Sequence, residues 1–471
     1  MKEPEEKTEI ERTTEEKSLR ATATMTAPYA SRFVLATKDQ SHQYFNVYQN
    51  RMKQLRASVV EAVNRHQEAA CTAHPVEERI LEIRLGVTCF IIGVIFKEMP
   101  LKPNVLREYT KEQAILLVPE HQNFVSPKDS LILEDDGGRV KLVVDDPTLV
   151  SRNVTGVVVA VLGQQIEGGA FKVETILNPG LPTQTPRTVP SRLRIAEEGG
   201  PKYVALVSDL NIGSPTLNPL YSSLLSDYIC GYLGSSENDQ KSVTQRIVRT
   251  ILVGNTFCPQ EEAPVHSKLR DHTKSFTVLD QARLETVLKE VDAFVYELCT
   301  NMPVDLIPGP KDPSNFSMPQ QAINKCLLPR ASQFTSLHLS TNPFFAVVEG
   351  VSMLGHSGQP TANIQNYVTL NTDETILDLL QQTLEWRHMA PTAPDTLSAF
   401  PFKTHDPFVI DDCPHVYFVG DQEEFESRRI TGASGQVVQL ISVPSFEKTS
   451  SFVLLNLETL DAHPVSLKLW D

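Results

Sequence analysis

Residues 304–315 read VDLIPGPKDPSN, a short apolar run followed by a turn that carries an aspartate. The run from Val304 to Ile307 predicts a buried strand, and Pro308-Gly309 predicts a turn at its carboxyl end. Ligands of layered α/β proteins collect at such strand ends, and carboxylates there are common metal ligands. The stretch therefore predicts either a working metal loop at Asp312 or a loop of that shape without the chemistry.

Strands and helices alternate on both sides of this stretch, from Lys202 onward. The candidate strands are YVALVSDL, RTILVGNTF, VDLIPG, FFAVVEGVSMLG, HVYFVGD and QVVQLISVPSF. Apolar residues recur at helical spacing in 219–232, 277–298 and 373–388. Strands joined by crossover helices predict a layered α/β domain over residues 201–471, with its chemistry at the loops beyond the strands.

Four of these strand-end loops resemble the metal loops of calcineurin-like metallophosphoesterases in order and setting. They read Ser208-Asp209-Leu210-Asn211, Gly254-Asn255-Thr256, Gly309-Pro310-Lys311-Asp312 and Gly420-Asp421-Gln422-Glu423. Working members of that family carry D-x-H, G-D, G-N-H-[D/E] and G-H-x-H at these points. Those motifs supply a shared carboxylate and imidazole ligands for two metal ions. The resemblance implies the layered fold of that family.

The first two loops depart from the family pattern. Asp209 keeps the first carboxylate, but Asn211 stands where the family has a histidine ligand. Asn255 replaces the aspartate that bridges the two metals. An amide oxygen can coordinate a metal, but it carries no charge to hold two dications close together.

The other two loops depart as well. Pro310 and Lys311 replace the Asn-His pair, and a lysine ammonium repels a metal ion. Asp421 and Glu423 stand at both histidine positions of the last loop. We therefore expect a phosphoesterase-like site without its chemistry: no catalytic residue, no metal site and no cofactor. The remaining acids, Asp312 among them, could still capture a stray cation.

The N-terminal half has a different pattern. Residues 83–178 contain β-branched, glycine-punctuated pieces such as CFIIGVIF and VTGVVVAVLG, separated by glycine turns. So many short strands in so few residues predict a small closed barrel, and we assign an OB-fold to 81–180. The strands carry few aromatic residues and the Asp135-Asp136 hairpin is acidic. This favours a structural or partner-docking barrel over a nucleic-acid reader.

Three further segments complete the predicted organisation. Residues 1–28 are densely charged and are expected to form a disordered tail. Residues 29–80 are expected to be a helical segment, because apolar residues recur at threes and fours between 40 and 70. Residues 181–200 are rich in proline, threonine and glycine and are expected to be a linker.

The composition of the chain argues against several classes of function. The chain has 471 residues and a formal charge of −15, so it repels phosphate on average and strong direct DNA binding is not expected. No apolar run approaches the roughly 20 residues of a membrane span, and the charged start is not a secretory signal. The seven cysteines have no zinc-type spacing, and their odd number favours a reducing compartment.

Two further local patterns give weaker evidence of a functional site than the strand-end loops do. Gly355-His356-Ser357-Gly358 hints at a nucleophile elbow, but Gln359 stands at its fifth position instead of glycine. A tight turn after a strand is the preferred interpretation. His415 lies at the entrance of a strand and is expected to be a hydrogen-bonded structural histidine.

An OB-type barrel followed by an inactivated phosphoesterase domain is similar to the B-subunits of replicative DNA polymerases. Five stretches resemble the small, or second, subunits of DNA polymerase delta in particular. They are QYFNVYQNRMKQLR, PVDLIPGPKDPSNFSMPQQ, TNPFFAVVEGVSMLGHSGQ, RHMAPTAPDTLSAFPFKTHDPFVIDDCPHVYFVGD and VPSF. RHMAP and PHVYFVG also resemble the small subunit of archaeal D-family polymerase, whose loops retain histidines. The likeness runs from about residue 40 to about 457.

The resemblance implies a non-catalytic scaffold subunit. In this family the small subunit holds the C-terminal cysteine-rich domain of the catalytic subunit and a third subunit that binds the sliding clamp. It further implies nuclear residence, with DNA contacted only indirectly or weakly and no membrane partner. The acidic balance suits docking onto a basic partner domain.

Other interpretations stay open at this point. One is a metal-dependent phosphodiesterase or exonuclease with a carboxylate-rich site. Another is a single-stranded nucleic-acid binder that uses the barrel. A third is the B-subunit of polymerase alpha or epsilon, which the PTAPDTL and CPHVYFVGD text favours less.

Overall fold

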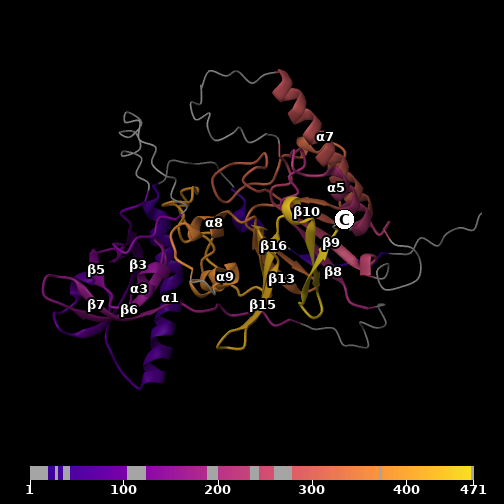
Figure 1. Ribbon diagram of the computed structural model, residues 1–471. Coiled ribbons are helices and arrows are strands. Elements are labelled where there is room, and N and C mark those ends of the chain that lie inside the picture. The colour runs from indigo at the N-terminus through magenta and orange to yellow at the C-terminus, as the bar shows by residue number, and fades with distance from the viewer. Residues whose placement is uncertain are drawn as a thin grey trace, which may run out of the picture.

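The computed structural model describes residues 20–26, 30–35, 43–102, 123–187, 200–233, 243–258, 278–370 and 374–467. These residues form three six-stranded sheets with helices on their outer faces (Figure 1). One sheet closes into a barrel, and the other two face each other. No helix among the described residues is both long and apolar enough to cross a membrane.

The barrel is built by residues 88–177. Its strands are β3 (Thr88–Glu98), β4 (Ser130–Glu134), β5 (Arg139–Val143), β6 (Val158–Gln165) and β7 (Phe171–Leu177). They pair in the order β3-β4-β5-β7-β6, and β6 returns to pair with β3 and closes the ring. A short strand, β2 (Val76–Glu77), adds to β3, and α3 (Pro147–Arg152) links β5 to β6.

Glycines allow the barrel strands to coil tightly, as the sequence predicts. A Cβ atom on Gly163 would lie 2.0 Å from the carbonyl oxygen of Lys172 on the paired strand. One on Gly93 would lie 2.6 Å from Leu133 Cγ. A side chain at either position would separate the strands.

Helix α1 (Phe45–Ala70) covers one side of the barrel. Its buried residues recur at threes and fours, and they pack on outward-facing residues of β3 and β6. The helix ends at Cys71, which adopts a left-handed conformation. The predicted helix at 40–70 is therefore confirmed with a later start.

The remaining residues form two facing sheets. One has the order β11-β10-β9-β8-β17-β18, and the other has the order β1-β12-β13-β14-β16-β15. The strands of the first are β8 (Tyr203–Val207), β9 (Ile247–Val253), β10 (Val304–Ile307), β11 (Leu337–Leu339), β17 (Ser451–Asn456) and β18 (Ala462–Ser466). Those of the second are β1 (Met25–Thr26), β12 (Phe344–Val348), β13 (Val351–His356), β14 (Val416–Gln422), β15 (Glu426–Thr431) and β16 (Val437–Pro444).

Helices complete the layers of this part. They are α5 (Pro219–Cys230), α7 (Val278–Asn301), α8 (Gln359–Gln365), α9 (Ile376–Glu385) and α10 (Phe446–Thr449), with short 3-10 turns at Ala30–Phe33, Ile80–Glu82, Lys325–Leu327 and Ala331–Gln333. One apolar core lies between the sheets, and it joins β8, β9 and β10 to β12, β13 and β14. α5 and α7 cover the outer face of the first sheet, and α9 covers that of the second. Figure 1 shows α5 and α7 on the side of this sandwich away from the barrel.

The structure corrects the expected extent of the disordered tail. Residues 20–26, placed in that tail from the sequence, run along the sandwich, and Met25 pairs with Val348 of β12. Their ATATMT pattern alternates, and Ala21, Ala23 and Met25 pack on the core between the sheets. Residues 1–19, 27 and 28 lie outside the described residues.

The expected linker is also corrected in its first part. Gln184 donates to the carbonyl oxygens of Pro414 and Val437, so this segment is held against the second sheet. Residues 188–199 lie outside the described residues. None of the seven cysteines, all of which lie among the described residues, forms a disulfide bond, and Cys71 and Cys326 are exposed.

Candidate functional site

The carboxyl ends of four strands converge at one edge of the sandwich. β8, β9 and β10 are parallel neighbours, so the loops that follow them leave from the same edge. β14 lies in the facing sheet, and Ser208 ties its end to the others. The Ser208 hydroxyl donates to Val253 O at 2.9 Å and accepts from the backbone N–H of Asp421 at 2.8 Å. The structure thus brings together the four loops that the sequence singled out.

Asn255 links the first three loops through both atoms of its amide. Its Nδ2 donates to Asp209 Oδ1 at 2.6 Å, and its Oδ1 accepts from the backbone N–H of Lys311 at 3.0 Å. The Lys311 N–H can only donate, so it fixes which end of the amide carries the oxygen. Both side chains of the Asn255–Asp209 pair are almost fully buried. The Asp209 oxygen that faces Asn255 therefore meets a donor within the chain.

Asp312 braces two loops instead of facing an open site. Its Oδ1 accepts from the backbone N–H of Phe257 at 2.9 Å, and its Oδ2 accepts from that of Gly309 at 2.7 Å. Burial raises the pKa of Asp312 to about 7, although these backbone donors favour the carboxylate. The aspartate at the tip of the 304–315 stretch thus holds the turn after β10 to the loop after β9.

Asn211 points to a residue that the sequence analysis did not select. Its Nδ2 donates to Glu447 Oε2 at 2.6 Å, and Glu447 also accepts from the hydroxyls of Ser214 and Thr216. Burial alone would raise the pKa of Glu447, but these three donors outweigh it and lower the pKa. The sequence analysis did not predict Glu447, because this residue lies on α10 and the predicted candidates all lie on strand-end loops. Its position within the resemblance stretch, next to VPSF, was the available sequence signal.

The remaining candidate residues lie at the outer rim of the four strand-end loops. Asp421 is exposed as a residue, but its carboxyl group lies beside that of Asp209. Partial burial of that carboxyl group and the neighbouring Asp209 carboxylate raise the pKa of Asp421. Pro310, Lys311 and Glu423 are exposed to solvent.

Four of these positions share an uncommon backbone conformation. Asp209, Asn211, Asn255 and Asp421 have φ angles of 52°, 46°, 51° and 57°. Left-handed conformations are rare for residues other than glycine, and asparagine and aspartate tolerate them best. Such conformations often gather at functional sites. The loops therefore keep the shape of a site that presents side chains from sharp turns.

The capacity of this edge for a metal ion is small. Nowhere among the described residues do three or more histidine, cysteine, aspartate or glutamate side chains gather in an arrangement suited to a metal ion. Asn211 Oδ1 is buried without a hydrogen-bond partner among the described residues, and a neutral oxygen alone is a weak ligand for a cation.

Residues 355–358 form the tight turn expected from the sequence. The Ser357 hydroxyl donates to Gln359 Oε1 at 2.8 Å instead of to a histidine. His415 is the structural histidine that the sequence predicts, because its Nδ1 lies 2.7 Å from Ser352 Oγ. Neither pattern contributes catalytic chemistry.

Comparison with known proteins identifies the family. The chain is 40% identical over 390 residues to a protein of Arabidopsis thaliana named "DNA polymerase delta small subunit", and the match covers 82% of this chain and 84% of that relative. The chain belongs to the family of DNA polymerase delta small subunits. It is also 37% identical to the protein of that name from Oryza sativa subsp. japonica, with 91% and 94% of the two chains covered. The protein of that name from Saccharomyces cerevisiae (strain ATCC 204508 / S288c) is 31% identical, with 92% and 91% covered.

Two family models divide this delta small subunit as its architecture does. "DNA polymerase delta subunit OB-fold domain" matches residues 43–176, which contain α1 and the barrel. The model for the B-subunit of DNA polymerases alpha and epsilon matches residues 204–427. The OB-fold and the family resemblance expected from the sequence are confirmed. Family membership makes the chain an accessory B-subunit of a polymerase, which is compatible with a non-catalytic role.

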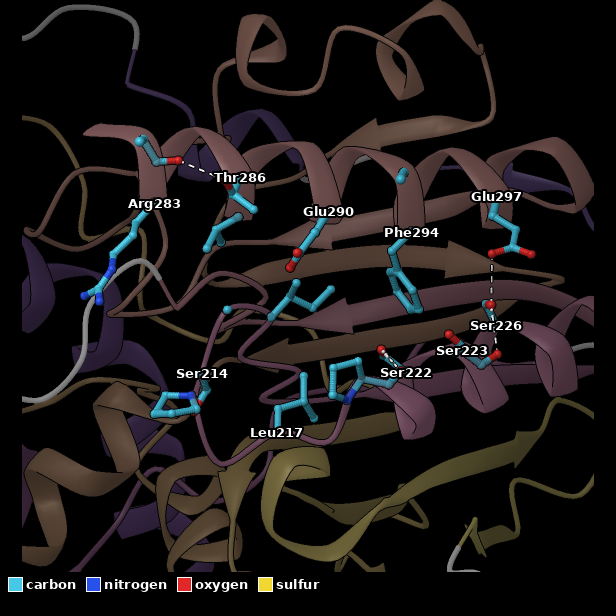
Figure 2. A pocket seen from close by; sticks show the side chains of 17 residues that line it. Ser214, Leu217, Ser222, Ser223, Ser226, Arg283, Thr286, Glu290, Phe294 and Glu297 are labelled. Atoms are coloured by element: carbon cyan, nitrogen blue, oxygen red, sulfur yellow. Dashed lines mark hydrogen bonds between the residues drawn. The ribbon is translucent and has the colours of Figure 1, made fainter. Parts of the chain in front are cut away.

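A second feature of this delta small subunit is a groove between α5 and α7. It encloses about 880 Å³, and Leu217, Val287 and Phe294 give it an apolar lining. Figure 2 shows Phe294 and Glu290 of α7 pointing toward the loop and helix that carry Leu217 and the serines of α5. Glu290, Glu297 and the serines of α5 add polar groups to this lining.

One contact between the barrel and the sandwich is a buried arginine, which adds to an apolar core that the two parts share. Arg51 of α1 is fully buried, and its Nε lies 2.8 Å from Asp406 Oδ2. Its other nitrogens donate to the carbonyl oxygens of Gly156 in the barrel and of Pro391 and Ala393 in the sandwich, at 2.7–2.8 Å. One guanidinium therefore contacts three separate parts of the chain.

His388 completes this junction. Its Nε2 lies 2.9 Å from Asp406 Oδ2, and both residues are buried. Burial and the nearby Arg51 charge lower the pKa of His388 to about 4, so the ring is neutral near pH 7. Burial alone would raise the pKa of Asp406, but the Arg51 charge and the hydrogen bond with His388 lower it below its usual range. Asp406 therefore stays ionised beside Arg51 near pH 7.

Proposed function

We propose that this chain is a non-catalytic scaffold subunit of DNA polymerase delta. It would link the C-terminal cysteine-rich domain of the catalytic subunit to a third subunit that binds the sliding clamp. Its place would be the nucleus, in chromosomal DNA replication and repair synthesis, with DNA contacted only indirectly or weakly. Relatives named as small subunits of that polymerase, matched over most of their length, support the proposal.

The sandwich is, on this proposal, a calcineurin-like phosphoesterase fold whose site has lost its chemistry. We place its boundaries at 201–471, with the OB-fold at 81–180, the helical segment at 29–80 and a linker at 181–200. The observation that carries the proposal is the Asn255 amide, which spans Asp209 and Lys311 where the fold would hold a bridging aspartate. Degenerate loops at Asn211, Asp421 and Glu423 and the bracing role of Asp312 add support.

Affinity purification of the tagged full chain from its own cells tests the scaffold role. We expect a large family-B polymerase and a clamp-binding third subunit to be recovered in near-equal amounts by mass spectrometry. In the same experiment, Ser223→Trp should fill the α5–α7 groove and reduce the recovery of one partner at least five-fold. Thr300→Trp, on α7 but outside the groove lining, is the matched control. Recovery of a monomeric chain alone would reject the scaffold role.

A nuclease assay with manganese tests the enzyme alternative. We expect no hydrolysis of single-stranded DNA or of bis-nitrophenyl phosphate above the level of Asp209→Ala. Activity that Asp209→Ala abolishes, in a preparation free of other subunits, would contradict the non-catalytic assignment. Salt-dependent binding of short oligonucleotides to the barrel would instead support direct nucleic-acid binding.

A further inference from the structure

A second groove lies where α1 begins against the barrel. It encloses about 370 Å³, within the roughly 300–1,000 Å³ of ordinary ligand pockets. Phe45, Tyr48 and Met52 line it from α1, and Val94 and Phe96 line it from β3. This hollow is here called the α1–β3 groove.

The apolar lining follows from the alternation of side chains along β3 and from the position of Phe45 at the start of α1. Phe90, Ile92, Val94 and Phe96 alternate along β3 and share its outward face, of which α1 buries the first two. Val94 and Phe96 continue that face and stay only half-buried. Phe45, in the first turn of α1, is 59% exposed beside them. The groove is therefore an apolar face that the described residues leave partly uncovered.

The rim of the groove is acidic. Glu134, Asp135 and Asp136 come from the β4–β5 hairpin and Asp395 from the sandwich, whereas Arg139 is the one cationic residue of the lining. Asp135 accepts hydrogen bonds from the backbone N–H groups of Ile80, Gly137 and Gly138.

The charge of this rim selects the kind of ligand. Lys102 pairs with Asp395 and Arg139 pairs with Glu134, so the carboxylates of the rim exceed these cations by two. This excess of negative charge repels a nucleic-acid backbone and attracts lysine and arginine. Aromatic and methionine side chains in the floor receive a large apolar side chain. The two features together fit a protein segment in which an aromatic or leucine residue is flanked by basic residues.

We propose that the α1–β3 groove is a docking site for a basic, apolar-anchored segment of a partner protein subunit. The apolar anchor enters between Phe45, Met52 and Phe96, and its basic neighbours face Glu134 and Asp136. This inference deepens the proposed scaffold role, and its tests can fail separately from that role.

A binding assay with a defined probe tests the chemistry. The probe is a short fluorescein-labelled peptide with a Phe-Leu pair flanked by lysines, titrated with the full chain by fluorescence anisotropy. Phe45→Ala and Asp136→Lys, both at exposed positions, should each weaken binding at least ten-fold. Phe316→Ala, which is 82% exposed, and Glu167→Lys, in the β6–β7 turn, are the matched controls and should change the dissociation constant less than two-fold.

Three results would overturn the docking site. They are the absence of saturable binding, equal binding by all four variants, and equal binding of a probe in which glutamates replace the lysines. Circular dichroism melting of each variant excludes unfolding as the cause of any loss.

Photo-cross-linking in the assembled complex identifies the source of the segment. A photoreactive amino acid at Gln49, which lines the groove, should capture a subunit peptide that contains lysine or arginine beside phenylalanine, tyrosine or leucine. Capture of an acidic segment, or no cross-link to a subunit, would reject the groove. A chain that still copurifies with polymerase subunits in that case would leave the scaffold role standing.

Discussion

At the scale of single residues, Asn255 determines what the strand-end loops can do. An aspartate there would repel Asp209, whereas the amide donates to it and accepts from Lys311. The sequence predicted the replaced residues and the four loops, because residue identity and order suffice for that. It did not predict that the amide would engage both neighbours, nor that Asp312 would brace two loops, because those contacts depend on side-chain rotamers and loop geometry.

Asn255→Asp should lower the free energy of unfolding at pH 8 by about 1–3 kcal/mol, because it places two carboxylates in contact. One of the two must then have a pKa above its unfolded value, so the folded state binds the proton more tightly. Stability is thus lost as the pH rises through the raised pKa and is partly restored at pH 5. Urea unfolding at pH 5 and pH 8 measures the difference.

Asn218→Asp is the matched control for this change. Asn218 caps α5 with its side-chain oxygen, and aspartate serves equally well at a helix start. Its stability should stay within about 0.5 kcal/mol at both pH values. An Asn255→Asp variant as stable as this control at pH 8 would show that the amide contacts contribute nothing.

At the scale of elements, apolar runs were easy to predict and polar edge strands were not. The runs at β8, β9, β10, β14 and β16 form the strands expected for them. FFAVVEGVSMLG was taken as one candidate, but a turn at Glu349-Gly350 folds it into the antiparallel pair of β12 and β13. β15 was missed because its ESRRIT sequence is polar on its exposed face, and β18 because AHPVS contains a proline.

β1 is the element whose packing is most easily tested. Met25→Asp places a charge against the core between the sheets, and it should destabilise the chain by about 0.5–3 kcal/mol. Hydrogen exchange at Val347 and Val348, the paired residues of β12, should accelerate in the variant. Thr22→Asp changes an exposed residue of the same segment and should leave that exchange unaltered.

At the scale of the whole molecule, the Arg51 junction and a shared apolar core hold the barrel and the sandwich together. The ion pair with Asp406 and three carbonyl contacts are all buried. The helical pattern of 40–70 predicted the helix that carries Arg51, but a charged residue on that pattern is normally solvated. Its partners lie more than a hundred residues away in sequence, so no local sequence pattern predicts them.

Arg51→Met should lower the free energy of unfolding by about 3–5 kcal/mol, because it leaves Asp406 buried without its main cation. The melting temperature should fall accordingly, which calorimetry measures. Lys53→Met, at an exposed position of the same helix, should melt like the parent chain. A single cooperative transition at the parent temperature in Arg51→Met would show that the junction is held by apolar packing alone.

The pairing of β1 with β12 also determines when β1 can form its contacts during synthesis of the chain. The backbone N–H of Thr24 donates to Glu349, which lies 325 positions later in the sequence. Arg51 pairs with Asp406, which lies 355 positions later. Ribosomes add about 5–20 residues per second, so both contacts lag their N-terminal partners by about 20–70 seconds. The strands of the barrel, by contrast, have all been made by residue 177. A nascent chain therefore carries the barrel strands and an unpaired leading strand until Val348 of β12 has been made.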